Sequence, residues 1–301
     1  MRQREQIRMT FEILRSRGAG EAYGYLTQVI GTAEPEDRAA LYPYCISLAV
    51  LCGKTAEALA ILQFAVKTEG FWYLPEVFES NELDDIRDEA AFIACQELSE
   101  KQYAKALDEA ETYCTWQGKT GESIVLALHG NGENWKDARD AWGFFRDRQV
   151  EYLQSRELDR WGVYCWEDDT DGWQQIPETC GKIGWTDYRE RILCGSGAAC
   201  NAILRAVARG DTPCQALVLY APWVPMLVTG EAEEMLKNLK EQGTALYLLC
   251  GAEDETCLPQ AERLAQEAAA AGIPCRTDWI EGRGRGLPED LAERVTALLG
   301  A

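Results

Sequence analysis

The sequence predicts a chain of two parts, an all-α N-terminal region followed by an α/β fold with a mostly parallel sheet. Residues 1–118 show only helical periodicity. After the polar, glycine-containing segment TWQGKTGES, short β-rich runs alternate with helical patterns. Strands that alternate with helices form βαβ units, in which the strands pair in parallel through right-handed crossovers. We therefore expect a helical domain at residues 1–118 and an α/β domain at residues 119–301.

The N-terminal region is expected to consist of helices joined by short turns. The helical patterns cover residues 2–17, 20–31, 36–52, 55–68, 87–99 and 101–116. Glycines such as Gly53 mark the turns between them. The stretch LAVLCGKTAEALAILQFAVK joins two amphipathic helices through such a turn and resembles a tetratricopeptide-type hairpin. The spacing is too irregular for a repeat array, so we interpret the region as a helical domain with hairpins of this kind.

The α/β region contains six predicted strands. They cover residues 123–129, 160–166, 190–196, 216–222, 245–251 and 275–281. The nearly continuous apolar run ALVLYAP is typical of a strand that is buried on both faces of a sheet. Helical patterns lie between the strands, in WKDARDAWGFFRDRQVEYLQ, AACNAILRAVARG, EAEEMLKNLKEQG and LPQAERLAQEAAAAG.

Charge and hydropathy exclude some classes of partner. The chain has 50 acidic and 30 basic residues, a formal net charge of -20. Such a surface repels phosphate backbones and anionic lipids, so we expect neither nucleic acid nor membrane as a partner. No apolar run approaches the roughly 18 residues of a membrane-spanning helix. The amphipathic N-terminus also lacks the apolar core of a signal peptide, and we expect a cytoplasmic protein.

The twelve cysteines do not predict a metal site. They form no C-x-x-C pair, and His129 is the only histidine. We expect free thiols and neither a metal nor a cofactor. The acidic run from Glu167 to Asp171 could hold a cation, but it has no EF-hand spacing, and a solvated loop is the preferred interpretation. The role of that loop stays open.

The stretch RILCGSGAACNAIL carries the strongest chemical signal. A predicted strand ends near Cys194, a turn of small residues follows, and a helix begins at once. Ser196 is expected at the apex of this turn, in a pattern small-x-Ser-x-small with Cys194 and Ala198 at the outer positions. Such a turn places a serine at a helix N-terminus, where backbone N–H groups stabilise an oxyanion. The alternative is an ordinary glycine-rich turn between a strand and a helix.

Two further motifs accompany this turn in the order that a hydrolase would need. The loop HGNGEN follows the strand SIVLALH, and Asp254 follows the strand LYLLCG. Together the three motifs resemble the α/β-hydrolase superfamily, in its carboxylesterase/phospholipase-like branch. The resemblance implies an α/β-hydrolase fold, with Ser196 as the nucleophile and Asp254 as the triad acid. It also implies an oxyanion hole formed by the backbone N–H groups of Asn131 and Gly197.

The resemblance covers about residues 120–300 and departs from the family at one position. In the family the last strand leads into a loop that reads G-x-G-H, whereas this chain has GRGR, with Arg285 in the place of the histidine. Guanidinium, with a pKa above about 12, cannot accept a proton from a serine. It could instead form a salt bridge with Asp254. His129 is a possible alternative base.

Three hypotheses about function follow. The first is a carboxylesterase-like serine-hydrolase scaffold that acts on or binds a small ester or acyl ligand, with catalysis impaired because Arg285 replaces the triad histidine. The second is an unusual Ser196 hydrolase with a non-standard base, such as His129 or a water held by Asp254. The third is a non-enzymatic interaction protein that binds a protein partner through its helical domain.

Overall fold

The computed structural model describes residues 3–166, 171–210, 212–229 and 232–300. Its contacts divide the chain into two compact units. The first consists of Met1–Ala110 together with Leu158–Val163. The second consists of Glu111–Glu157 together with Tyr164–Ala301. Strand β1 (Tyr113–Gly118) belongs to the second unit, although the sequence predicted a helix at this position.

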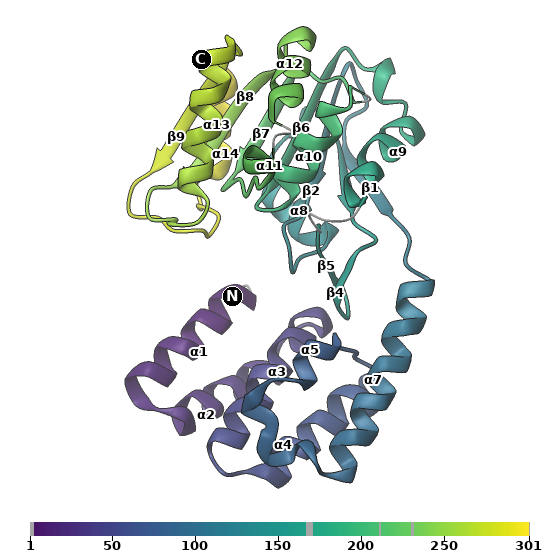
Figure 1. The fold of residues 1–301 in the computed structure, drawn as a ribbon, viewed down its shortest axis with the longest axis vertical. Helices are drawn as coiled ribbons and strands as arrows, with labels where there is room; N and C mark the ends of the chain where they lie inside the picture. Colours follow the sequence, from purple (N-terminus) through teal and green to yellow (C-terminus); the bar gives the residue numbers. More distant parts are fainter. Residues whose placement is uncertain (1–2, 167–170, 211, 230–231, 301) are drawn as a thin grey trace. The chain divides into compact units, whose positions relative to one another are not determined.

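The first unit is helical (purple to blue in Figure 1) and confirms the all-α N-terminal region. Its helices are α1 (Gln3–Arg17), α2 (Ala19–Ile30), α3 (Pro35–Leu51), α4 (Thr55–Gln63), α5 (Pro75–Phe78), α6 (Asp84–Arg87) and α7 (Ala90–Asp108). Helix α4 continues as a π-helical turn over Phe64–Thr68, and a short 3-10 helix covers Asn81–Leu83. Apolar side chains from α2 to α7 meet in one buried cluster around Leu26, Leu41 and Phe92, and half-buried side chains of α1, such as Ile13, pack against it.

Two helices predicted over residues 87–99 and 101–116 are a single helix, α7, which ends at Asp108. No glycine or proline separates the two patterns. Ser99, near the predicted break, has a structural role within the helix. Its buried Oγ accepts a hydrogen bond of 2.9 Å from the backbone N–H of Tyr73 and fixes the segment before α5.

The strand predicted over residues 160–166 is not part of the main sheet, and that prediction is wrong. The segment forms a small hairpin of β4 (Leu158–Arg160) and β5 (Val163–Tyr164). Gly162 makes the turn with φ +75°, a backbone conformation that favours glycine. The ring of Trp161 lies 4.6 Å from that of Phe71, so the hairpin completes the apolar core of the first unit.

Among the described residues the second unit contains one seven-stranded sheet, in the order β1-β3-β2-β6-β7-β8-β9. Its strands are β1 (Tyr113–Gly118), β2 (Ser123–Leu128), β3 (Gln149–Gln154), β6 (Glu190–Ser196), β7 (Ala216–Tyr220), β8 (Ala245–Gly251) and β9 (Cys275–Ile280). All neighbours pair in parallel except β1, which is antiparallel to β3. The predicted mostly parallel sheet is confirmed.

Strand β3 occupies a stretch that the sequence predicted as helix. The sequence pattern predicted a helix up to residue 154, but helix α8 (Trp135–Trp142) ends twelve residues earlier. Its C-cap is Gly143, where an added Cβ would lie 2.5 Å from the carbonyl oxygen of Arg139. Every residue of β3 is buried. Burial on both faces removes the alternation that would have indicated a strand.

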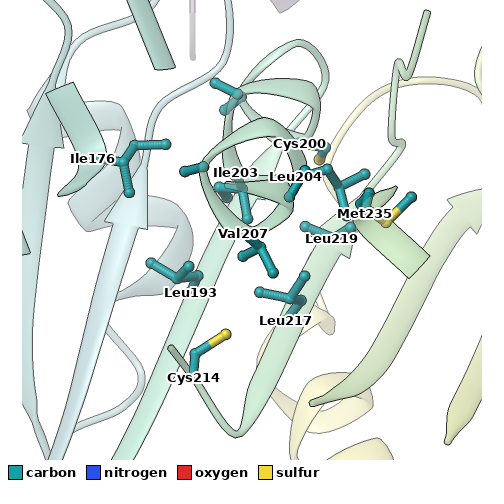
Figure 2. Packing of buried hydrophobic residues seen from close by; sticks show 14 of the residues in the cluster. Ile176, Leu193, Cys200, Ile203, Leu204, Val207, Cys214, Leu217, Leu219 and Met235 are labelled. Atoms are coloured by element: carbon teal, nitrogen blue, oxygen red, sulfur yellow. The ribbon is translucent and has the colours of Figure 1, made fainter. Parts of the chain in front are cut away.

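Helices cover both faces of the sheet. Those of the second unit are α8, α9 (Gln175–Lys182), α10 (Ala199–Ala208), α11 (Met226–Thr229), α12 (Ala232–Gln242), α13 (Leu258–Ala271) and α14 (Leu291–Gly300), with 3-10 turns at Gly172–Gln174 and Trp185–Asp187. Figure 2 shows side chains of α10, such as Ile203 and Val207, packed on Leu193 and Leu217 of the sheet. Helices α8 and α14 contribute to the cluster on the opposite face.

Candidate active site

The predicted strand-to-helix turn lies at the end of a central strand. Strand β6 ends at Ser196, which pairs with Tyr220 of β7, and helix α10 begins at Ala199. The only residue of this turn with a positive φ is Gly197, at +59°. Ser196 therefore has strand geometry, and the left-handed conformation of the turn belongs to the residue after it.

Helix α10 approaches β6 closely at the turn. A Cβ added to Gly195 would lie 3.1 Å from the Cβ of Ala199 and 3.0 Å from Cδ1 of Ile203. Small residues are thus required at 195 and 199, and these two positions flank Gly197 symmetrically. A Cβ added to Gly197 would meet no atom within 4 Å.

Ser196 faces the loop after β2. A Cβ added to Gly130 would lie 3.1 Å from Ser196 Oγ and 3.0 Å from Glu133 Oε2. Glu133 Oε2 accepts a hydrogen bond of 2.7 Å from the N–H of Gly130. The structure thus brings Ser196 together with the loop HGNGEN at residues 129–134 (the HG loop), as the sequence predicted. It also places the carboxylate of Glu133 beside them, which the sequence did not indicate.

His129 is buried, and both of its ring nitrogens are in contact with backbone groups. Nε2 accepts a hydrogen bond of 3.1 Å from Ser155 N–H, and Nδ1 lies 2.7 Å from the carbonyl oxygen of Gly130. This pattern fits a neutral ring protonated on Nδ1. Burial lowers the pKa of His129 to about 4. Neither nitrogen is available to Ser196, which argues against His129 as an alternative base.

The two predicted oxyanion donors differ in their surroundings. The N–H of Gly197 donates to the carbonyl oxygen of Tyr220 at 3.1 Å. Its role as an oxyanion donor stays a prediction. Asn131 lies in the HG loop, and its Oδ1 accepts a hydrogen bond of 2.8 Å from Trp166 N–H. That contact holds the loop in place, while the indole Nε1 of Trp166 donates to the carbonyl oxygen of His129.

Asp254 lies directly beyond β8, as predicted, and is only 5% exposed. Its Oδ1 accepts hydrogen bonds from the N–H groups of Thr256 and Cys257, at 3.1 and 2.9 Å. Its Oδ2 is buried without a hydrogen-bond partner among the described residues. One oxygen is therefore held by backbone donors, and the other can still accept a hydrogen bond.

Arg285 lies beside that second oxygen. Its Nε is 3.7 Å from Asp254 Oδ2, an ion pair longer than a hydrogen bond. Its terminal nitrogen donates to Cys257 Sγ at 3.3 Å. This hydrogen bond, and then the charge of Asp254, raise the pKa of Arg285, so the guanidinium stays protonated. The arginine predicted for the histidine position does contact the predicted acid.

Tyr220 connects the two loops of the candidate site, and the sequence analysis did not single it out. Its carbonyl oxygen accepts from Gly197 N–H, and its hydroxyl donates to the carbonyl oxygen of Gly286 at 2.6 Å. The next residue, Ala221, has the only positive φ of a described non-glycine residue, +43°. The run ALVLYAP gave no signal for either role, because it reads simply as a buried strand.

Other predictions concern metals and membranes. Among the described residues, no group of three or more His, Cys, Asp or Glu side chains could hold a metal ion. The acidic run falls mostly at residues 167–170, which lie outside the described residues. No helix in the described parts of the chain has the length and hydropathy to cross a membrane.

Comparisons with known proteins agree with this architecture. Residues 3–107 match the family model "A/B hydrolase-like, N-terminal domain". The chain has the α/β-hydrolase fold. An uncharacterized protein from Bacillus cereus ATCC 10987 is similar over 99% of this chain and 98% of its own, with 22% identity and a TM-score of 0.56. No curated protein sequence matches.

A second solved structure, esterase PE8, covers 63% of this chain and 98% of its own, with 15% identity and a TM-score of 0.50. At these identities the likeness establishes the fold alone. The match to the Bacillus cereus protein extends over nearly the whole chain, so a helical N-terminal region before an α/β-hydrolase fold occurs in another protein as well.

Proposed function

We propose that this chain is an esterase-like α/β-hydrolase scaffold that binds a small ester or acyl ligand and is impaired in catalysis. One observation carries the proposal: the free oxygen of Asp254 faces the guanidinium of Arg285, where a triad needs an imidazole. A permanently protonated group cannot take the proton of a hydroxyl nucleophile. The fold shared with esterase PE8 supports an ester or acyl compound as the ligand class.

The surroundings of His129 support the impairment as well. It is the only histidine of the chain, and its two ring nitrogens lie against backbone groups of Gly130 and Ser155. A working hydrolase would have to find its base elsewhere, such as a water held by Asp254. Loss of the base from a triad leaves roughly 10³–10⁴-fold catalysis over water, from the oxyanion hole and binding alone.

A fluorophosphonate probe and an activated acetate ester test the impairment. We expect slow or absent labelling and turnover near the background rate, with no difference between the wild type and Ser196→Ala. Rapid labelling that Ser196→Ala abolishes would refute impairment and favour the unusual-hydrolase hypothesis. Ligand binding is tested separately, by thermal-shift screening of short-chain esters and acids, because a scaffold without turnover can still bind.

A second candidate function, contact with a protein partner, is favoured by apolar exposure on the helical unit. Phe11 and Tyr44 stack edge to face with their rings 5.7 Å apart, and they are 38% and 37% exposed. A photo-crosslinking residue at position 11 tests this candidate, with the exposed position of Arg15 as a control. A specific adduct at 11 that is absent at 15 is expected if this surface binds a partner.

A further inference from the structure

The geometry points to Gly197, and not Ser196, as the position from which this fold presents a nucleophile. The inference rests on the proposed function and deepens it: the site has lost both its nucleophile and its base, whereas its acid, Asp254, is retained. Three independent features of the turn support it, namely backbone conformation, close packing and open space.

The first feature is backbone conformation. A nucleophile elbow is a sharp, strained turn between a strand and a helix, and the strain falls on the residue at its apex. The positive φ of this turn is at Gly197, +59°. Ser196 still pairs with Tyr220 in the parallel ladder of β6 and β7, so it precedes the apex.

The second feature is the position of the small residues. The motif small-x-nucleophile-x-small needs small side chains two residues before and two residues after the nucleophile. The contact of 3.1 Å between an added Cβ on Gly195 and the Cβ of Ala199 identifies these two positions in space. The residue midway between them is Gly197. With Ser196 at the centre, the outer residues would be Cys194 and Ala198, and the close contact would have no role.

The third feature is the space around each residue. A side chain on Gly197 would begin in open space, with no atom within 4 Å of its Cβ. The side chain of Ser196 instead lies against Gly130 of the loop after β2. Two residues earlier on the same face of β6, Cys194 is fully buried in the cluster that contains α8. Ser196 therefore continues a core-facing row.

The retained acid completes the argument. Asp254 Oδ1 is held by two backbone N–H groups, and Oδ2 lacks a hydrogen-bond partner in the described parts of the chain. This is the arrangement that would orient an imidazole at position 285. Tyr220 links the turn at Gly197 with the loop of Arg285 through its carbonyl oxygen and its hydroxyl. A complete catalytic triad at this site would thus need two more side chains, a hydroxyl at position 197 and an imidazole at position 285.

The double variant Gly197→Ser/Arg285→His tests this inference by supplying both. The introduced hydroxyl would attack the ester carbonyl carbon, and its proton would pass to the introduced imidazole and then to the leaving alkoxide. Water then releases the acid from the acyl-enzyme. We expect at least about a tenfold higher kcat/KM on 4-nitrophenyl acetate than for Arg285→His alone, since only the double variant gives the imidazole a hydroxyl to deprotonate, and general-base catalysis typically contributes 10²–10⁴-fold. A fluorophosphonate adduct should map to position 197 by mass spectrometry.

The controls separate the two residues. Gly197→Ala/Arg285→His bears the same backbone strain and should stay inactive. Ser196→Ala in the double variant should leave most of the gained activity. A folded double variant without gain overturns the inference but leaves the proposed impairment intact. Wild-type labelling at Ser196 would instead overturn both.

A test that keeps glycine at 197 covers the case in which the strained variants fail to fold. Arg285→His alone should then give no gain, because no nucleophile faces the introduced imidazole. A tenfold gain that Ser196→Ala removes would show that Ser196 is the nucleophile and would overturn the inference. Circular dichroism and thermal melts establish which variants are folded.

Discussion

Arg285 Nε lies 3.7 Å from Asp254 Oδ2, and the two side chains differ sharply in exposure, at 58% and 4%. The buried carboxylate depends on its surroundings, whereas the exposed guanidinium can turn to solvent at little cost. Asp254 is therefore held in place by its backbone contacts, whereas Arg285 can be substituted with little effect on the fold. This asymmetry makes Arg285 a suitable position for substitution and gives a first prediction about stability.

Asp254→Ala should lower the free energy of unfolding by about 2–3 kcal/mol, because it leaves the N–H groups of Thr256 and Cys257 without their acceptor. Arg285→Ala should cost less than about 1 kcal/mol, since the guanidinium is largely exposed and its Nε lies 3.7 Å from the carboxylate, beyond hydrogen-bond distance. Urea denaturation measures both. Asp254→Asn is the matched control, because its amide oxygen can still accept, and it should fall between the two. Equal losses for all three variants would mean that the ion pair, and not the backbone contacts, stabilises this loop.

The loop that carries Arg285 packs on Gly251 at the end of β8. A Cβ on Gly251 would lie 2.2 Å from the carbonyl oxygen of Arg283 and 2.3 Å from that of Gly284. Backbone atoms cannot yield as a flexible side chain can, so Gly251→Ala should displace the loop and destabilise the fold by several kcal/mol, roughly 2–4. Gly284→Ala is the control, because its Cβ would meet nothing within 4 Å. A thermal melt that shows equal shifts for the two variants would contradict the close approach.

The outcome for the fold shows which sequence signals are reliable. Strands β6 and β8 were predicted with their observed bounds, because each is a bounded apolar run between a helix and a turn. Strand β3 was missed, since its six residues are all buried and therefore lack a period of two. The hairpin of β4 and β5 was placed in the main sheet because Val163 and Tyr164 have strand propensity, which says nothing about which strands pair.

The candidate site was also predicted only in part, and the part that was missed again depends on tertiary structure. The unusual arginine and its contact with Asp254 followed from chemistry and chain order. The position of the elbow apex did not, because small-x-x-x-small fits both Cys194–Ala198 and Gly195–Ala199. Only the φ of Gly197 and the contact between Gly195 and Ala199 distinguish the two alignments. The bond from Gly197 N–H to Tyr220 is likewise a tertiary contact without a local sequence signal.

Trp161 should contribute to the stability of the helical unit, although it lies in the hairpin of β4 and β5, far from the helices in the sequence. Its ring lies 4.6 Å from that of Phe71, and its N–H donates to the carbonyl oxygen of Trp72 at 3.3 Å. Trp161→Ala should cost about 2–3 kcal/mol through lost apolar contact. Hydrogen exchange should then be faster around Phe71. Trp116→Ala is the control, because Trp116 is 57% exposed on β1 and should cost less than about 0.5 kcal/mol.

His129 should make the stability of the protein depend on pH. Burial lowers its pKa from the ordinary value of 6.5 to about 4, so between these values the unfolded chain binds a proton that the folded chain does not. Stability from this group is therefore fully present above about pH 6.5 and is lost as the pH falls toward 4. A shift of this size corresponds to about 3 kcal/mol. Urea denaturation at several pH values from 4 to 8 measures the slope.

His129→Gln isolates this contribution from that of the carboxylates, which also titrate at the acid end of the range. The glutamine has an oxygen that can accept from Ser155 N–H, and it does not titrate. The variant should be less stable than the wild type at pH 8, because the ring packs near Trp166 with their centroids 5.4 Å apart. Its stability should nevertheless fall less steeply between pH 6.5 and 4, so that the two curves converge toward acid. Parallel curves would mean that the folded protein takes up the proton as readily as the unfolded chain does. The ring of His129 would then be open to solvent, and its rejection as a base for Ser196 would lose its main support.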